Sequence, residues 1–193
     1  MSYTRKSNPT PHVTYKGRHR FEHWYRDNQI YLITARCRAR YPAFEHDDAK
    51  AIFWDRFTHY THQHGFEPFV TTLLNNHYHT LGHLKSGREL GPMMQKIHGS
   101  IAKLVNDRQP VRRVPFWHDS RSRDYFDGCI RDEKQFRLAY RYMQTQARRS
   151  GLPERCVQTR VMVDLETGLG RAVREQALLR GVRYARYERR GPL

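Results

Sequence analysis

The sequence predicts a protein of the α+β class, with an antiparallel sheet and helices packed on one face of that sheet. Runs rich in β-branched and aromatic residues alternate with helical segments in the order strand, helix, strand, strand, helix, strand, strand, helix. Strands that follow each other without a helix favour antiparallel pairing, because parallel strands need a long crossover. The chain has 193 residues, 38% of them hydrophobic, which is enough for one domain with its own core.

The first half of the chain supplies three strands and one helix. Residues 29–37 (QIYLITARC) form the first expected strand. Two aspartates then offer an N-cap for a helix over 47–65, which has apolar residues at helical spacing and a glycine at its end. Residues 66–74 and 77–84 have the pattern of two strands, or of one bent strand, separated by two asparagines.

The second half begins with residues 86–89, whose serine and glutamate are spaced as in a capping box. They predict a helix that runs to about Val105. Residues 111–117 and 124–130 are weaker strand candidates, and an aspartate predicts the cap of a third helix over 132–149. This order suits the split β-α-β plan of ferredoxin-like and RRM-like sheets.

The domain prediction divides the chain into three parts. Residues 1–25 are basic and lack a sustained apolar period, so they are expected to form an N-terminal arm. Residues 26–152 hold the predicted globular domain. Residues 153–193 form an arginine-rich C-terminal extension, in which 171–190 could form a basic helix despite a glycine in its middle.

The charge balance points to nucleic acid as a partner. The chain has 35 Lys and Arg against 19 Asp and Glu, a formal net charge of +16, and 28 of the basic residues are arginines. A small domain needs a net charge of only about 2–8 for solubility. Guanidinium groups match phosphate oxygens and stack on bases, so an arginine excess favours nucleic-acid binding over a merely soluble surface.

The composition argues against membrane and disulfide-bonded classes. No run approaches the roughly 20 apolar residues of a membrane span, and the polar N-terminal stretch lacks the apolar segment of a signal peptide. The three cysteines are scattered without a C-x-x-C pair, which favours a reducing compartment. The expected location is the cytoplasm, in association with the nucleoid.

His77 and His79 are the first residues with a chemical role to consider. Residues two apart on a strand project from the same face, so the two imidazoles could bind one divalent metal. With 12 histidines, however, roughly one such triplet is expected by chance. A second one, at 62–64, falls at a helix end, where residues two apart do not face each other.

The third helix offers a nucleophile. Tyr142 and Gln146 are four residues apart and therefore neighbours on one helix face. A phenol can form a covalent intermediate, and an amide oxygen can complete a metal shell. Tyr140 lies two residues from Tyr142 and so projects from a different face. An ordinary surface tyrosine would explain Tyr142 equally well on this helix alone.

Four segments in order resemble one family. They are IYLITARCRARYPAF, LLNNHYHTLGHL, WHDSRSRDYFDGCIRDEKQF and AYRYMQTQARRSGL, and they span about 29–152. They are similar to the opening strand, the Asn-His-hydrophobe-His strand, the Trp…Ile-Arg-Asp stretch and the tyrosine helix of single-tyrosine HUH transposases of the insertion-sequence-200-like group. The resemblance is closer still to the REP-associated tyrosine transposases. It departs from them in one motif, where Gln146 and Ala147 stand in place of Asn-Pro.

The resemblance implies a mechanism and a set of site residues. His77, His79 and Gln146 would bind Mg²⁺ or Mn²⁺, and Tyr142 would attack a phosphate of single-stranded, hairpin-bearing DNA. Cleavage would leave a 5′-phosphotyrosine link and a free 3′-OH, and rejoining would reverse the step. The sequence leaves open whether the protein is a monomer or a homodimer.

Several further residues are candidates for DNA contact. Arg36, Arg38 and Arg40 alternate along the end of the first strand and could line a groove that follows the backbone, although a solvated strand edge would look the same. His83 shares the strand face of His77 and His79 and could contact DNA or a residue that supports the metal ligands, or act as a fourth ligand. Arg148 and Arg149 could clamp a phosphate, although a solvated helix end would explain them equally well. Two rival functions remain: a hairpin DNA- or RNA-binding protein of the same fold without cleavage, and an RRM-type RNA-binding domain, whose Lys/Arg-Gly-aromatic pattern is not found.

Overall fold

The structure is a computed structural model that describes residues 25–118, 124–163, 175, 176 and 178. Its described part is built on one five-stranded sheet in the order β4-β1-β3-β2-β5, with every neighbouring pair antiparallel. The strands are β1 (Gln29–Arg36), β2 (Phe66–Leu73), β3 (His77–Leu84), β4 (Tyr125–Cys129) and β5 (Gln158–Val161). The helices are α1 (Asp47–Gln63), α2 (Leu90–Asn106), α3 (Glu133–Gln144) and α4 (Gln146–Ser150), and the 3-10 turns are η1 (Arg38–Arg40), η2 (Gly87–Glu89) and η3 (Glu154–Cys156). The predicted α+β class and ferredoxin-like antiparallel sheet are confirmed.

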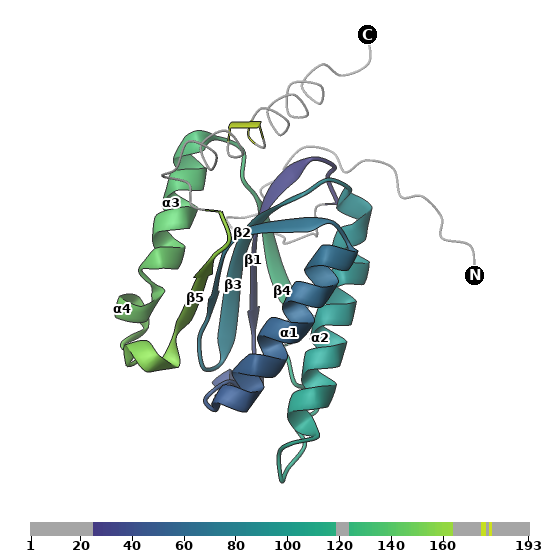
Figure 1. The fold of residues 1–193 in the computed structure, drawn as a ribbon, viewed down its shortest axis with the longest axis vertical. Helices are drawn as coiled ribbons and strands as arrows, with labels where there is room; N and C mark the ends of the chain where they lie inside the picture. The colour runs from purple at the N-terminus through teal and green to yellow at the C-terminus, as the bar shows by residue number, and fades with distance from the viewer. Residues whose placement is uncertain (1–24, 119–123, 164–174, 177, 179–193) are drawn as a thin grey trace, which may run out of the picture.

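One face of the sheet packs against α1 and α2, which lie side by side (Figure 1). Phe53 and Phe57 of α1 and Ile97 of α2 are buried in this core together with Tyr78 of β3. The Tyr78 side chain has no exposed surface, and its hydroxyl makes a 2.9 Å hydrogen bond with Nε2 of His98 in α2. Since side chains alternate along a strand, the burial of Tyr78 here directs its neighbours on β3 to the opposite face.

The opposite face is covered by α3, so the predicted placement of all helices on one face is wrong (Figure 1). Phe136, Ala139, Tyr140 and Met143 form an apolar stripe on α3 and pack on the sheet with residues of β1, β2 and β3. Both the stripe and this face of the sheet would expose apolar surface if they stayed apart. Each fully buried large side chain stabilises the fold by about 1.5–3 kcal/mol, which favours the two-sided arrangement.

The third helix is broken where the sequence predicted one continuous helix over 132–149. The predicted Asp132 cap is confirmed, since its side chain accepts the backbone N–H of Gln135 at 2.8 Å. Thr145 interrupts the helix: its hydroxyl donates to the carbonyls of Arg141, at 2.9 Å, and Tyr142, at 3.2 Å. Such bonds from a threonine back to the preceding turn bend helices.

Other local predictions also differ from the structure. Residues 111–117 form no strand beyond a single bridge between Trp117 and Cys37, because Pro115 within this stretch and Pro110 directly before it cannot donate ladder hydrogen bonds. Residues 66–74 and 77–84 are two strands joined by a tight connection rather than one bent strand. The capping box at Ser86 is not formed: that side chain makes no cap bond, and Glu89 instead contacts Nδ1 of His64 at 2.8 Å.

The C-terminal part extends the sheet. β5 pairs with β2 although it falls in the segment assigned to the C-terminal extension. The predicted basic helix over 171–190 lies outside the described residues except for 175, 176 and 178, and residues 1–24 of the predicted N-terminal arm also lie outside them.

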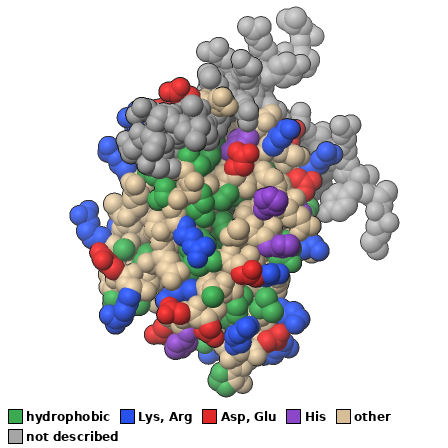
Figure 2. Space-filling view, viewed as in Figure 1, with side chains coloured by type: hydrophobic (Ala, Val, Ile, Leu, Met, Phe, Trp, Pro, Cys, Tyr) green, Lys and Arg blue, Asp and Glu red, His purple; other side chains and the backbone are tan. Residues whose placement is uncertain are grey.

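Charges of both signs are mixed on one face of the described chain. Figure 2 shows Lys and Arg side chains near the middle and at the edges of this face, with Asp and Glu side chains among them. Within the described ranges, none of the helices is long and apolar enough to cross a membrane.

Candidate active site

His77 and His79 lie on the α3 side of β3, with their ring centroids 5.0 Å apart. In the antiparallel register, His77 lies opposite Arg36 of β1, and His79 lies opposite Thr34. The strand alternation predicted for this pair thus places both imidazoles on one face, next to an arginine and a threonine from the neighbouring strand.

Asn76 orients the His77 ring. Its Oδ1 lies 2.6 Å from Nδ1 of His77, and an amide oxygen can only accept, so Nδ1 donates its proton. The lone pair of the neutral ring is then on Nε2. The amide Nδ2 of Asn76 donates to the carbonyl of Arg40 at 3.1 Å, which links the histidine to the η1 turn.

Thr34 contacts Nδ1 of His79 as Asn76 contacts Nδ1 of His77. Its hydroxyl lies 2.7 Å from Nδ1 of His79 and can accept that proton, which leaves the lone pair on Nε2. Nε2 of His79 lies 3.5 Å from the hydroxyl of Tyr142. The His79 side chain is only 4% exposed, so β3, β1 and α3 together enclose it.

Both imidazoles are held neutral. Burial, and then the charges of Arg36 and Arg40, lower the pKa of His77 from 6.5 to about 4. Burial also lowers the pKa of His79 to about 3, with smaller effects from His77 and Arg36. Neutral imidazoles with a lone pair on Nε2 are the form that binds metal ions.

Helix α3 places Tyr142 against the histidines. The rings of Tyr142 and His79 meet edge to face, with centroids 5.2 Å apart. The Thr72 hydroxyl of β2 donates to the Met143 carbonyl at 3.2 Å and holds this part of α3 on the sheet. Tyr140 points elsewhere, as predicted: it is buried in the core and stacks on Phe136.

Gln146 and Arg149 flank the tyrosine. Gln146 is 4% exposed, and its Nε2 donates to the Tyr142 carbonyl at 2.9 Å, which leaves its Oε1 as the acceptor atom. The guanidinium of Arg149 lies 5.3 Å from the centre of the Tyr142 ring.

The described residues contain no group of three or more His, Cys, Asp or Glu side chains suited to a metal. The donor set predicted from the resemblance is of a different kind, with two imidazoles and one amide oxygen.

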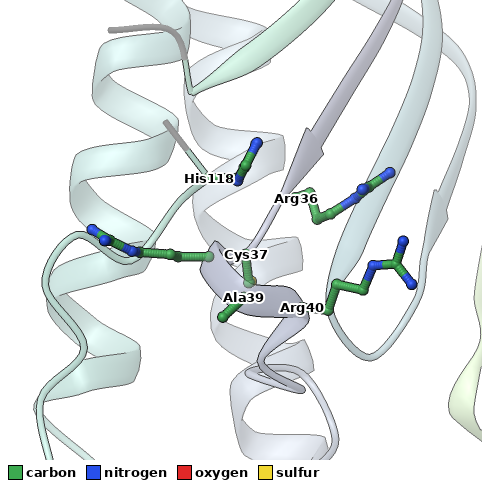
Figure 3. Close-up of a pocket in the computed structure, with 6 residues that line it drawn as sticks. Arg36, Cys37, Ala39, Arg40 and His118 are labelled. Atoms are coloured by element: carbon green, nitrogen blue, oxygen red, sulfur yellow. The ribbon is translucent and has the colours of Figure 1, made fainter. Parts of the chain in front are cut away.

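Arg36, Arg38 and Arg40 do not lie along one strand. β1 ends at Arg36, whereas Arg38 and Arg40 belong to the η1 turn, so the predicted alternation along the strand is wrong. The chain turns here because Ala39 and Arg40 both have positive φ, at 52° and 56°. All three arginines nevertheless line one hollow of about 580 Å³, shared with His118 (Figure 3).

The remaining predicted contact residues are not brought to this hollow. His83 shares the α3 face of β3 but is only 3% exposed, with Nδ1 3.8 Å from a carboxylate oxygen of Glu67. Arg148 is exposed in the last turn of α4. Their contacts with DNA stay predictions.

Sequence reasoning missed three residues at this site. Asn76 and Thr34 hold the two histidines, and His118 completes the hollow. Asn76 could have been found from its position directly before His77. Thr34 and His118 had no such signal in the local spacing, because Thr34 reaches His79 through the pairing of β1 with β3, and the backbone N–H of His118 donates to the distant Arg36 carbonyl.

Comparison with known proteins rests on structure. No protein-family profile and no curated protein sequence matches the chain. The structure of a REP-associated tyrosine transposase bound to a REP hairpin matches with a TM-score of 0.59 and 14% sequence identity, over 71% of this chain and 77% of that one. The chain has the fold of a REP-associated tyrosine transposase. The resemblance drawn from the motifs is therefore confirmed for the fold.

A second solved structure has a weaker likeness to the chain. It is described as a candidate transposase from Deinococcus radiodurans R1, with a TM-score of 0.44 and 16% identity, over 61% of this chain and 89% of that one.

Proposed function

We propose that this protein is a transposase that nicks and rejoins single-stranded DNA through a covalent link to Tyr142. The observation that carries the proposal is the 3.5 Å approach of the Tyr142 hydroxyl to Nε2 of His79, beside a second histidine on the same strand face. A nucleophile next to paired neutral imidazoles is an arrangement suited to phosphoryl transfer.

In the proposed cleavage, the phenolic oxygen of Tyr142 attacks the phosphorus of a backbone phosphodiester. A bond forms between that oxygen and phosphorus, and the bond from phosphorus to the 3′ oxygen breaks. The phenolic proton leaves to water, and the 3′ oxygen takes up a proton to become a free 3′-OH. Rejoining runs in reverse: a 3′-OH attacks the phosphotyrosine and releases Tyr142. The link retains the energy of the phosphodiester, so rejoining needs no external energy source.

The residues around Tyr142 fit a divalent ion, Mg²⁺ or Mn²⁺. His77 and His79 would bind it through Nε2, because Asn76 and Thr34 occupy their Nδ1 atoms, and Gln146 would contribute Oε1. When bound, such an ion offsets negative charge on the phosphate in the transition state. The guanidinium of Arg149 beside the Tyr142 ring adds a fixed positive charge.

The proposed substrate is single-stranded DNA that carries a hairpin. Its support is the hairpin in the structure of the REP-associated tyrosine transposase, together with the net charge of +16 of this chain. In this proposal Arg36, Arg38 and Arg40 contact the backbone on the His77 side, while Arg148 and Arg149 contact it near Tyr142. Such a protein would act where single-stranded DNA forms, in the nucleoid.

The decisive experiment incubates the protein with hairpin-bearing single-stranded DNA and Mn²⁺, followed by a denaturing gel. The expected result is a protein–DNA adduct that disappears with EDTA and with Tyr142→Phe. Tight binding of the hairpin without an adduct would instead favour the alternative, a DNA- or RNA-binding protein of the same fold that does not cleave.

A further inference from the structure

The tyrosine helix is tied to the sheet by two hydroxyl groups that take no part in the proposed cleavage. Thr72 of β2 donates to the Met143 carbonyl at 3.2 Å, and the hydroxyls of Thr72 and Thr159 lie 3.0 Å apart. A hydroxyl has one proton, and a carbonyl can only accept. Since Thr72 donates its proton to Met143, Thr159 is the donor to Thr72. The chain of hydrogen bonds therefore runs from β5 through β2 to the residue directly after Tyr142.

The Met143 carbonyl lies where a donor from outside the helix is needed. α3 ends at Gln144, so Met143 is in the last turn, where backbone carbonyls lack the donors of a continuing helix. The Thr72 hydroxyl supplies such a donor from the sheet. Thr72 has no exposed surface, so water does not compete for this bond.

The register of the sheet connects the same threonine to the histidine pair. Thr72 lies opposite His79 of β3 on one side and opposite Thr159 of β5 on the other. Side chains of directly opposed residues project from the same face of a sheet, here the face that α3 covers. The residue next to His79 across the sheet is therefore also the residue that holds the helix carrying Tyr142.

β5 is also held at the edge of the sheet from the opposite face (Figure 1). Side chains alternate along a strand, so Gln158 and Arg160 project toward α1 while Thr159 projects toward α3. Nε1 of Trp54 in α1 donates to Oε1 of Gln158 at 2.6 Å, and the Arg160 guanidinium lies 4.1 Å from the centre of the Trp54 ring. Because Trp54 is itself buried, α1 fixes the place from which Thr159 reaches Thr72.

We propose that β5 is a positioning element of the active site, in which Thr159 and Thr72 hold Tyr142 at His79. The inference rests on the proposed function for the reaction that it assists, and it assigns a role in that reaction to the start of the C-terminal extension. Both threonines act through Met143 and not on the substrate. A displacement of the reacting groups by about 1 Å can lower a rate by about 100-fold. Loss of these hydroxyls should therefore slow the attack by Tyr142 without weakening DNA binding.

The first measurement follows the Tyr142 ring itself. 3-Fluorotyrosine is incorporated at position 142 of the full chain, and its ¹⁹F NMR shift is recorded without DNA or metal. The shift should differ from that of the denatured chain, because this ring meets His79 edge to face at 5.2 Å. Thr72→Val should move the shift toward the denatured value, and Thr159→Val should move it in the same direction by a smaller amount. Thr72→Ser keeps the hydroxyl and should restore the original shift.

Thr71→Val is the matched control on the same strand. Thr71 and Thr80 form a buried pair of hydroxyls 2.7 Å apart, on the face that packs against α1 and α2. The variant loses the same kind of bond without affecting α3, so the ¹⁹F shift should stay unchanged. Thermal melting followed by circular dichroism compares the stability of Thr71→Val and Thr72→Val. Equal changes of the shift in the two variants would overturn the inference, because the effect would then be one of general stability.

The second measurement separates attack from binding. The rate of adduct formation is measured with Mn²⁺ at saturating hairpin DNA, and the Kd of the DNA is measured by fluorescence anisotropy. Thr72→Val should lower the rate by about tenfold to 100-fold and Thr159→Val by about threefold, while the Kd changes less than about twofold. An unchanged ¹⁹F shift in Thr72→Val would refute the inference, and so would an unchanged rate.

The two measurements separate this inference from the proposed function. A wild type that forms no adduct, with a ¹⁹F shift that moves in Thr72→Val and not in Thr71→Val, would refute cleavage and keep the positioning of Tyr142. A wild type that forms the adduct, with the same rate in Thr72→Val/Thr159→Val, would keep cleavage and refute the positioning role.

Discussion

Replacing Tyr142 by Phe isolates the proposed nucleophile, because the change removes one oxygen and leaves the ring. The Tyr142 hydroxyl has one contact with a side chain among the described residues, a long 3.5 Å approach to Nε2 of His79. A hydrogen bond of good geometry contributes about 1 kcal/mol to stability, and one this long contributes less. Tyr142→Phe should therefore change the free energy of unfolding by less than about 1 kcal/mol.

The effect on cleavage should be far larger than the effect on stability. Loss of a nucleophile has lowered turnover by about 10⁶-fold in a hydrolase where it was measured, and here no other oxygen replaces that of Tyr142. Tyr140 cannot substitute for it, because its ring is buried and stacked on Phe136 at a centroid distance of 6.2 Å. We expect Tyr142→Phe to bind the hairpin DNA as the wild type does and to form no adduct.

Tyr140→Phe is the matched control, with the same chemical change two residues away on the same helix. It should still form the adduct, at a cost in stability of about 1 kcal/mol or less. Both variants are compared by denaturing gel for the adduct, by anisotropy for DNA binding and by thermal melting. An adduct that survives in Tyr142→Phe and disappears in Tyr140→Phe would show that the wrong tyrosine was identified. Adducts in both would refute tyrosine chemistry altogether.

Three more predictions concern the histidine pair. His79→Ala should retain the fold, with a loss of roughly 1–3 kcal/mol in the free energy of unfolding because a buried hydrogen bond is removed. It should abolish both nicking and the binding of Mn²⁺ measured by electron paramagnetic resonance, and nicking at the wild-type rate would contradict the assignment. Because the pKa values of His77 and His79 are lowered to about 4 and about 3, Mn²⁺ affinity should stay constant as the pH falls from 7 to about 5. A loss of Mn²⁺ affinity that begins near pH 6.5 would show that the imidazoles are not shielded. Because the histidines of the unfolded chain bind protons at a higher pH than those of the folded chain, the free energy of unfolding should decrease as the pH falls from 6.5 toward 4. Asn76→Ala should weaken Mn²⁺ binding by about tenfold, because it frees the His77 ring, whereas Asn75→Ala should leave it unchanged; equal effects of the two variants would argue against a positioning role.

The sequence by itself determined most of the local elements and the shared strand face of His77 and His79. Alternation along 77–84 predicted that His77 and His79 share a face, since side-chain direction on a strand follows from the backbone alone. The cap at Asp132 and the different directions of Tyr140 and Tyr142 were equally predictable. Each of these features depends on residues within a few positions of one another, where spacing is a direct physical constraint.

Tertiary structure alone decided which elements meet. The amphipathic pattern of α3 specifies that one side of the helix is buried, but not which face of the sheet it covers, because both faces are apolar. The approach of Tyr142 to His79 depends on that choice. Likewise, Thr34 reaches His79 only through the register of β1 against β3, and the η1 turn that gathers Arg36, Arg38 and Arg40 is held by Phe116 and Asn76. These contacts join residues that are tens of positions apart, and local spacing places no constraint on the distance between them.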